Sequence, residues 1–485
     1  MSPRYEMVVG LEVHVQLATR SKLFCACPTD GAGAPPNSRV CPVCTGQPGV
    51  LPVLNRAAAE LGFQAALALD CRIAPESVFA RKNYFYPDLP KAYQISQYEL
   101  PFASGGGLDI RVGKLPVKRV RIHRIHLEED AGKLLHAIGA RELDHSLVDF
   151  NRGGTPLVEI VSEPDIRSAD EAVAYLTALK EILQYAGISR CDMEKGELRC
   201  DANVSVRPEG ESRLGTRTEI KNLNSFRFLK AALEFEFQRQ TGMLEAGERV
   251  IQETRLWDQA RGSTAAMRSK EEAQDYRYFP DPDLPALVAA PAWIEELRGR
   301  LPELPAVRRS RFMAQYGLSV YDAEVLTATR ALGDYFDAAV RGPGPGAAKT
   351  AANLVATELL ARLNSAGLGA DQSRIPPGEL GALAEMIVAG ALSSKGAKAA
   401  FSALWDKGGS ARATVEALGL SQISDEGRLR AWLGEALAAD PQAAADLKSG
   451  KERAVGVLMG AAMKLSQGRA DPAVLNRLIK EFIRA

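Results

Sequence analysis

The chain has 485 residues, of which 60 are Lys or Arg and 60 are Asp or Glu. This length predicts two or three domains, and the balanced charge excludes the broad positive field that would by itself indicate a nucleic-acid-binding protein. No apolar run is long enough to span a bilayer and the N-terminus lacks a basic segment followed by an apolar one, so we expect a cytoplasmic protein without a membrane partner.

The first expected strand, residues 10–17, alternates apolar and polar side chains. At the strand period of two, its apolar residues share one face, and Glu12, His14 and Gln16 share the other. A carboxylate and an imidazole two residues apart are typical of a metal or proton-transfer site. For one strand alone, a solvent-exposed polar face is the commoner interpretation.

Four of the seven cysteines follow this strand in two pairs. Cys25 and Cys27 are separated by thirteen residues, rich in Gly and Pro, from Cys41 and Cys44. A flexible loop of this kind can place two thiolate pairs around one tetrahedral ion, and four Cys ligands leave no open position, which indicates structural zinc. The alternative is four buried or unpaired thiols, and the three remaining cysteines are expected in the core.

Two helices and two turn-rich segments lie between the expected strands. The helices cover residues 55–69 and 168–187, each with a capping residue at its start. Residues 84–91 and 275–285 both set aromatic side chains beside Pro-Asp in loops too restrained for a helix. Such loops often bind ligands, although tight packing against a sheet is nearly as common.

The polar pattern of the first strand recurs in three later segments, residues 119–130, 198–207 and 217–221. The first of these changes parity at His123-Arg124, as a β-bulge would, and ends in three acidic residues. The polar residues of the three segments and of the turn after them include Glu128, Glu129, Asp201, Asn203, Arg207, Arg217, Glu219, Lys221, Asn222 and Asn224. Side by side in one sheet, these strands would form a polar floor suited to a cation and an anionic substrate. The alternative is a charged, solvated sheet face.

After Pro291, strand patterns vanish and helical periodicity dominates. Residues 393–395 (Ser-Ser-Lys) lack the Gly-rich loop of an amidase, so we interpret them as a helix start. From Asp446 to the end, eight basic residues face four acidic ones. This surplus could contact a phosphate backbone, although composition alone favours a solvated surface. The candidate contacts are Lys451, Arg453 and Lys464.

Seven segments carry long and specific motifs: residues 10–17, 81–97, 126–133, 148–168, 198–208, 215–226 and 275–285. These motifs resemble the GatB family, whose members belong to the aspartyl/glutamyl-tRNA(Asn/Gln) amidotransferases, and the resemblance covers the whole chain. The helical tail is similar to a YqeY-type domain. At Asp281 the family more often has Glu, which leaves the chemistry unaffected.

The resemblance implies an α+β fold with three domains. Residues 1–292 would form a large antiparallel-sheet catalytic domain similar to glutamine synthetase and the guanidino kinases. Residues 293–407 would form an all-α helical domain, and residues 408–485 a small YqeY-like tail domain that binds tRNA.

The activity that the resemblance implies is that of a kinase and transamidase. Such a protein activates the side-chain carboxylate of Glu-tRNA(Gln) or Asp-tRNA(Asn) with ATP and Mg²⁺ and then amidates it. Ammonia comes through a channel from the amidase GatA, and the small protein GatC completes a heterotrimer. An aminoacyl-tRNA synthetase is a further expected partner in a larger assembly. Which of the two misacylated tRNAs is the substrate is not encoded in these motifs.

The resemblance also assigns roles to the polar floor. Glu12, His14 and Glu129 are expected to bind Mg²⁺, with Glu128 next. Asp201 and Glu219 are the other expected catalytic carboxylates. The expected ATP- or substrate-binding residues are Arg207, Arg217, Lys221, Asn203, Asn222, Asn224 and Lys91. Two alternatives from other classes are a non-catalytic tRNA-binding scaffold and a carboxylate–amine ligase that acts on a free amino acid.

Overall fold

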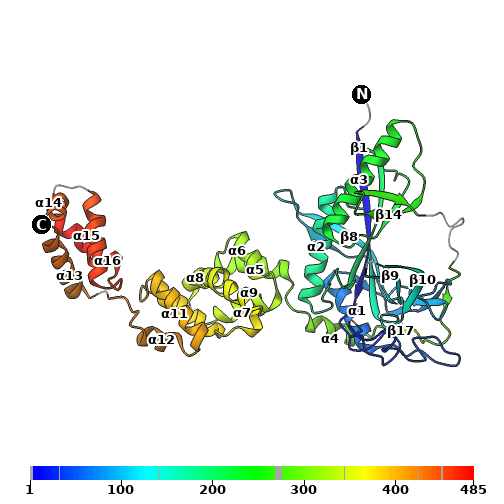
Figure 1. Ribbon diagram of the computed structural model, residues 1–485, viewed down its shortest axis with the longest axis horizontal. Helices are drawn as coiled ribbons and strands as arrows, with labels where there is room; N and C mark the ends of the chain where they lie inside the picture. The colour runs from blue at the N-terminus through cyan, green and yellow to red at the C-terminus, as the bar shows by residue number, and fades with distance from the viewer. Residues whose placement is uncertain are drawn as a thin grey trace. The chain divides into compact units, whose positions relative to one another are not determined.

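The structure is a computed structural model that describes residues 4–31, 33–139, 141–267, 276–342, 344–423, 425–448 and 452–484. The chain divides into two compact units, Met1–Leu304 and Pro305–Ala485. Strands belong to the first unit and the second is helical (Figure 1). The expected α+β fold is therefore confirmed.

A ten-stranded sheet is the centre of the first unit, and it contains all four strands that the polar pattern predicted. Its order is β15-β14-β13-β12-β1-β11-β8-β6-β2, with β7 paired to β8. Neighbouring strands are antiparallel except β13 and β14, which are parallel, so the sheet is mixed rather than purely antiparallel. The strands are β1 (Tyr5–Gln16), β2 (Arg72–Ile73), β6 (Ala103–Ser104), β7 (Gly107–Ile110), β8 (Lys118–Glu129), β11 (Pro156–Ser162), β12 (Leu198–Pro208), β13 (Thr218–Lys221), β14 (Glu253–Asp258) and β15 (Ser263–Ala266).

The predicted parity change in β8 is confirmed. Val161 of β11 is opposite Arg124, whereas the next residue, Ser162, is opposite Ile122. His123 is therefore the extra residue of a bulge. The bulge puts His126 and Glu128 on one face of β8 and Leu127 and Glu129 on the other.

Helices cover the apolar face of this sheet. The two predicted helices are α1 (Arg56–Ala68) and α2 (Ala169–Tyr185), capped by the side chains of Asn55 and Ser168 as expected. A third, α3 (Phe226–Glu245), packs against α2 and β12 and supplies the crossover between the parallel strands β13 and β14. Apolar residues of the sheet and these helices form one continuous buried core.

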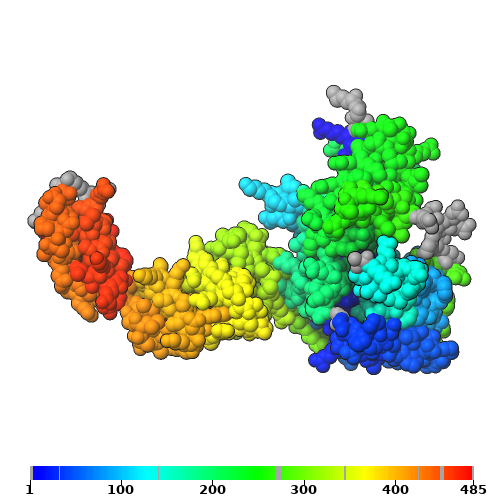
Figure 2. Space-filling view, in the orientation of Figure 1, coloured from blue at the N-terminus to red at the C-terminus, as the bar shows by residue number. Residues whose placement is uncertain are grey.

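Three small sheets surround the large one. Strands β16 (Phe279–Pro280), β4 (Ala80–Asn83) and β5 (Tyr93–Ser96) pair with one another, which brings together the two aromatic loops predicted at residues 84–91 and 275–285. Strand β17 (Leu287–Val288) pairs with β3 (Glu76–Ser77). Strands β9 (Lys133–Ile138) and β10 (Arg141–Asp149) form a largely exposed hairpin, visible on the surface of the first unit in Figure 2.

Helix α4 (Pro291–Arg300) closes the first unit. It packs on α1, where the ring of Trp293 meets that of Phe63 edge to face at 5.2 Å. The expected domain boundary at residue 293 therefore falls inside the segment that belongs to the sheet domain, and the compact unit extends to Leu304.

The second unit contains two separate apolar cores. Helix α12 contributes Ala411 and Val415 to the first core, whereas the second core begins at Leu429, later than the expected boundary at residue 408. Ser393 caps α11, so the Ser-Ser-Lys segment is a helix start, as interpreted. The helices of the first core are α5 (Pro305–Tyr316), α6 (Val320–Leu326), α7 (Arg330–Ala339), α8 (Ala348–Leu354), α9 (Leu360–Ala366), α10 (Pro377–Val388), α11 (Ser394–Lys407) and α12 (Ala411–Ala417), with short helices η1 (Pro345–Ala347), η2 (Val355–Leu359) and η3 (Ala370–Gln372). Those of the second core are α13 (Glu426–Ala439), α14 (Pro441–Lys448), α15 (Glu452–Leu465) and α16 (Pro472–Arg484).

None of the helices in the part of the chain that the structure describes has both the length and the apolar character needed to cross a lipid bilayer.

Candidate active site

Strand register places histidines and carboxylates side by side on the polar face of the large sheet. His14 of β1 is opposite Glu159 of β11, and Glu159 is opposite His126 of β8. Glu12 is opposite Asp201 of β12. Residues directly opposite each other on neighbouring strands share a face, so these side chains gather in one place.

His14 lies at the centre of a carboxylate cluster. Its Nε2 is 3.4 Å from Glu159 Oε2, 3.6 Å from Glu128 Oε1 and 3.7 Å from Glu12 Oε1. His126 Nε2 contacts the same group, at 3.3 Å from Glu159 Oε2 and 3.8 Å from Glu128 Oε2. Glu128, Glu159 and His126 are buried, whereas Glu12 and His14 are partly open to solvent. These five residues are called the His14 cluster below.

The charges of this cluster are strongly coupled. Burial alone lowers the pKa of His14 and His126, but their contacts with Glu159 and Glu128 outweigh burial and raise both pKa values to about 9. Burial alone raises the pKa of Glu159, yet His126 and His14 hold it well below its usual value. Burial and the neighbouring Glu159 raise the pKa of Glu12. In the metal-free protein, two imidazolium groups therefore balance the buried carboxylates.

A divalent cation can take over this balancing role. Ligand atoms of Glu12, His14 and Asp201 lie within 4.8 Å of one another, as do those of His14, Glu128 and Glu159. Carboxylate oxygens are the ligands that Mg²⁺ prefers, and the two groups share His14. The donor set therefore fits one or two hard cations on the polar face.

Unpaired nitrogen donors lie beside the carboxylates. Arg124 Nε, Arg199 Nε and His126 Nδ1 are buried and have no hydrogen-bond partner among the described residues. Arg199 is held in place through its other nitrogen, which donates to Asp130 Oδ1 at 2.8 Å. Buried donors without partners are costly unless a ligand accepts from them. Their position next to the carboxylates of the His14 cluster suits the oxygens of a phosphate or of a substrate carboxylate.

Lys221 joins the two outer carboxylates of the floor. Its Nζ is 2.8 Å from Asp201 Oδ2 and 2.9 Å from Glu219 Oε1. Burial alone lowers the pKa of Lys221, but these two carboxylates raise it above its usual value. Asp201 therefore connects the His14 cluster to Lys221, and Glu219 lies one strand further out.

Glu129 occupies a different place from the one expected for it. Because it has the opposite strand parity, its side chain lies on the other face of β8 from Glu128. Its Oε1 accepts from the Ile95 backbone N–H at 2.9 Å and forms an ion pair with Lys91. Within the described residues, the structure thus brings Glu12 and His14 together with Glu128 and Glu159, and brings Glu129 together with Lys91.

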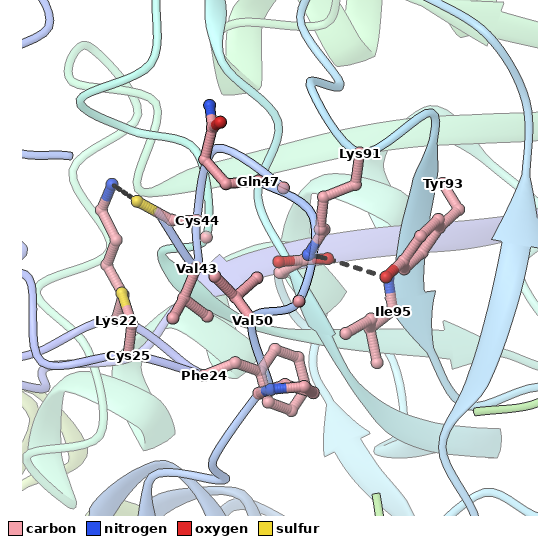
Figure 3. A pocket seen from close by; sticks show the side chains of 15 residues that line it. Lys22, Phe24, Cys25, Val43, Cys44, Gln47, Val50, Lys91, Tyr93 and Ile95 are labelled. Carbon is pink, nitrogen blue, oxygen red and sulfur yellow. Dashed lines mark hydrogen bonds and ion pairs between the residues drawn. The ribbon is translucent and has the colours of Figure 1, made fainter. Parts of the chain in front are cut away.

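Lys91 and Glu129 line a cavity of about 190 Å³ whose opposite wall is the cysteine loop (Figure 3). The sulfur atoms of all four predicted ligands lie within 4.8 Å of one another, close enough to surround one tetrahedral ion. Interaction with the Cys25 thiol and the nearby Lys22 ammonium lower the pKa of Cys44 to about 4, although burial opposes this. The arrangement of Cys25, Cys27, Cys41 and Cys44 is therefore compatible with the predicted four-cysteine metal site.

The other predicted ligand-binding residues are dispersed. Arg207 Nε donates to Glu6 Oε1 at 2.7 Å near the far end of β12, and Arg217 is exposed. Asn203 lies on the polar face opposite Gly10. Asn222, in a left-handed conformation with φ 69°, accepts from Asn224 and donates to the carbonyl of Trp257. It lines a separate open pocket with Trp257 and Asp258.

The two aromatic loops meet at the edge of the site. The rings of Tyr98 and Tyr278 are stacked, with centroids 4.2 Å apart, and Tyr84 meets Tyr276 edge to face. Burial, together with the charges of Glu128 and Glu159, raises the pKa of the Tyr278 hydroxyl. The Arg124 guanidinium lies 5.9 Å from the centre of the Tyr98 ring, so the stacked tyrosines border the His14 cluster.

In the tail, Arg453 and Lys464 are exposed, and Lys451 lies outside the described residues.

Sequence reasoning gave no role to Glu159, His126, Arg124 or Arg199, although the last three lie on strands that it predicted. Glu159 sits in the otherwise apolar run Leu157–Val161, which carries no alternation to mark a polar face. A carboxylate inside such a run is rarely fully buried without a partner, and that was the available signal. His126 lies two residues before Glu128, beyond the bulge at His123, and therefore shares its face of β8.

Comparison with known proteins agrees with this architecture. The family model described as the GatB/GatE catalytic domain matches residues 7–295, and that described as the GatB domain matches residues 334–483. The chain is 53% identical over 477 residues to the GatB component of the aspartyl/glutamyl-tRNA(Asn/Gln) amidotransferase of Carboxydothermus hydrogenoformans, covering 98% of both chains. It is 53% identical over 480 residues to the protein of that name from Geobacter sulfurreducens, and 50% identical over 483 residues to that from Brevibacillus brevis, covering 99% of both chains in each case. The chain therefore belongs to the GatB family of the aspartyl/glutamyl-tRNA(Asn/Gln) amidotransferases, and is a component of these tRNA-dependent ligases.

Proposed function

We propose that this protein activates the side-chain carboxylate of Glu or Asp carried by tRNA with ATP, and then exchanges the phosphate for ammonia. A carboxylate oxygen attacks the γ-phosphorus and ADP leaves, giving an acyl phosphate. Ammonia nitrogen then attacks the carbonyl carbon, inorganic phosphate leaves, and the surplus proton passes to a nearby base. The product is Gln-tRNA(Gln) or Asn-tRNA(Asn).

The observation that carries this proposal is the His14 cluster together with the unpaired donors beside it. Phosphoryl transfer to a carboxylate brings several anions together, and catalysis depends on positioning and neutralising them. Glu12, His14, Glu128, Glu159 and Asp201 would hold Mg²⁺, which supplies the neutralising charge when bound. Arg124 and Arg199 would donate to phosphate oxygens.

Other predicted residues take narrower roles in the proposal. Lys221 would steady the phosphates through its position beside Asp201. The Lys91–Glu129 pair would act at the cavity next to the cysteine loop rather than at the metal. We leave Arg207 out because Glu6 already engages it. Arg217, Asn203, Asn222, Asn224 and Glu219 remain proposed substrate-side residues.

The expected partners belong to the same proposal. The amidase GatA would supply ammonia, the small protein GatC would complete the heterotrimer, and the complex would work in the cytoplasm, where misacylated tRNA is found. The four cysteines would hold structural zinc. Residues 408–485, the proposed tail domain, would contact tRNA through exposed basic residues such as Arg453 and Lys464.

The test is a Glu12→Gln variant of the complete complex, presented with misacylated tRNA, ATP, Mg²⁺ and glutamine. Loss of one metal-side group is expected to slow Gln-tRNA or Asn-tRNA formation by at least about 100-fold, leaving the partner's glutaminase activity and complex assembly intact. Glu163→Gln is the matched control, because Glu163 pairs with the exposed His123 of the same sheet, away from the His14 cluster.

The outcome separates the proposal from its alternatives. A tRNA-binding scaffold would show no ATP hydrolysis that depends on misacylated tRNA and Mg²⁺. A free amino-acid ligase would hydrolyse ATP with glutamate alone. Wild-type rates of amidated tRNA formation by Glu12→Gln would refute the assigned metal site.

A further inference from the structure

Lys22 is a buried lysine with no carboxylate partner in the described part of the chain. Its side chain has 0% exposure. Nζ donates to the backbone carbonyl of Phe150 at 3.3 Å and to Cys44 Sγ at 3.6 Å. Figure 3 shows this second contact as the dashed line between Lys22 and Cys44, on the cysteine-loop side of the cavity.

A buried ammonium group needs an anion, because burial without one is strongly unfavourable. The carbonyl of Phe150 satisfies one N–H donor but supplies no charge. The remaining neighbour, Cys44, can supply it as a thiolate. The Cys44 sulfur also accepts from the Cys41 backbone N–H at 3.2 Å. Cys44 Sγ thus receives two donors, as a metal-bound thiolate would.

The charge of a four-cysteine metal site explains why a lysine should be buried there. Zn²⁺ with four thiolates carries a net charge of about −2. Such a site in a half-buried loop is stabilised by nearby N–H donors and positive charge, and these surrounding groups affect how tightly the metal is held. Lys22 is a cation that the fold places within reach of the cluster, with its Nζ 3.6 Å from Cys44 Sγ.

We propose that Lys22 is a positioning residue of the four-cysteine site, whose ammonium group donates to the Cys44 thiolate and offsets part of the cluster's negative charge. This inference rests on the proposed zinc site and goes beyond it by naming the group that tunes it. The local backbone fits the role. Gly154, at φ 84°, lies against the Lys22 stem, where an added Cβ would approach Lys22 Cδ to 3.4 Å and Cys44 Cβ to 3.6 Å.

A role for Lys22 in the neighbouring cavity is less well supported. Lys22 lines that cavity, but its ammonium is already engaged and its side chain has no solvent exposure. The other lysine of the cavity, Lys91, pairs with Glu129 instead. The two lysines therefore belong to different clusters, one to the thiolates and one to a carboxylate.

The experiment measures zinc affinity of the full-length chain by competition with a chromogenic chelator. Lys22→Met keeps the length of the side chain and removes its charge. We expect its zinc dissociation constant to rise about 10- to 100-fold, with faster zinc release. Substitution of Co²⁺ for zinc gives a second readout, because the thiolate-to-Co²⁺ charge-transfer bands should shift on loss of the Lys22 donor. Lys118→Met, which removes a partly buried lysine paired with Glu171 elsewhere in the same unit, should change neither property.

Lys22→Arg and Lys22→Gln extend the test if the methionine variant does not fold. Arginine keeps the positive charge, and Lys22 borders a cavity that can accommodate the larger side chain. The Lys22→Arg protein should therefore bind zinc at least about tenfold more tightly than the Lys22→Gln protein. Equal zinc affinity and Co²⁺ spectra in wild-type, Lys22→Met and Lys22→Gln proteins would overturn the inference. So would wild-type protein that folds without bound zinc. Amidated tRNA formation by that same zinc-free protein would leave the proposed transamidation standing.

Discussion

Glu159 offers the most direct test of the electrostatics of the site, because the sequence assigned it no role and the structure gives it two histidine partners. Its carboxylate also lies 3.7 Å from the Arg124 guanidinium. In a Glu159→Gln variant, the amide keeps the volume of the side chain while the negative charge shared by His14 and His126 disappears. Among the described residues, both imidazoles then keep Glu128 as an acidic neighbour, and His14 also keeps Glu12. The variant should therefore destabilise the charged form of both histidines.

The size of this loss of folding stability follows from the pKa values of the two histidines. A rise from 6.5 to about 9 corresponds to about 3 kcal/mol of favourable interaction for each imidazolium. If Glu159 supplies about half of this, its removal costs the metal-free protein about 3 kcal/mol in total at pH 6. Because the folded pKa lies above the unfolded one, this contribution is complete below pH 6.5 and is lost as the pH rises through 9.

Urea unfolding of the metal-free protein at pH 6 and at pH 10 measures this difference. The gap between wild type and Glu159→Gln should be about 3 kcal/mol larger at pH 6 than at pH 10. At pH 10 both histidines are neutral, and of the ion pairs that the described residues form with Glu159 only the one with Arg124, at 3.7 Å, remains. Glu163→Gln should show no comparable gap, since its partner His123 is exposed. An equal loss at both pH values would mean that Glu159 acts through packing or through Arg124 and not through the histidines, and the reasoning would be wrong. In the complete complex supplied with misacylated tRNA, ATP and Mg²⁺, the Glu159→Gln substitution should lower the rate of amidation by at least about 100-fold.

Three further outcomes test other parts of the molecule. Gly46 has φ 69° and an added Cβ would lie 2.6 Å from Lys91 Cγ, so Gly46→Ala should lower the free energy of unfolding by about 1–3 kcal/mol. Gly49→Ala, at φ 84° with open space around it, should cost less in the same urea titration. Removal of residues 425–485 should raise the Kd for tRNA at least about tenfold at moderate salt while sparing the partner's glutaminase activity; an unchanged Kd would contradict the proposed tail contact. Arg81→Met removes the ion-pair partner of the buried Asp281 carboxylate, which destabilises the loop after β16. Limited proteolysis should therefore cut this loop faster than in wild type.

The polar floor could be predicted from the sequence because strand periodicity is a local property. Alternation assigned Glu12, His14 and Asp201 to the polar faces of their strands, and Glu128 entered the polar floor with the acidic run that ends the strand at residues 119–130. The structure brings these four residues to the same place because their strands are neighbours or nearly so in one sheet. Their convergence needed only that the polar strands share a sheet.

The residues that were missed depend on non-local pairing. Strand β11 lies between β1 and β8 and is buried on both faces, so its sequence shows no alternation, and the role of Glu159 emerges only from its register with His14 and His126. The parallel pair β13–β14 likewise depends on the crossover helix α3, which local strand patterns do not reveal.

Glu128 and Glu129 show how one strand end can serve two chemical environments. They are adjacent in sequence, and the expectation that both face the metal treated the acidic run as a unit. Because successive residues of a strand face opposite ways, Glu128 joins His14 while Glu129 joins Lys91. Any movement of the last residues of β8 would therefore displace a proposed metal ligand and the cavity ion pair together. For the same reason, substitutions at these two neighbouring positions should produce different defects: loss of phosphoryl transfer at Glu128, and an altered cavity beside the cysteine loop at Glu129.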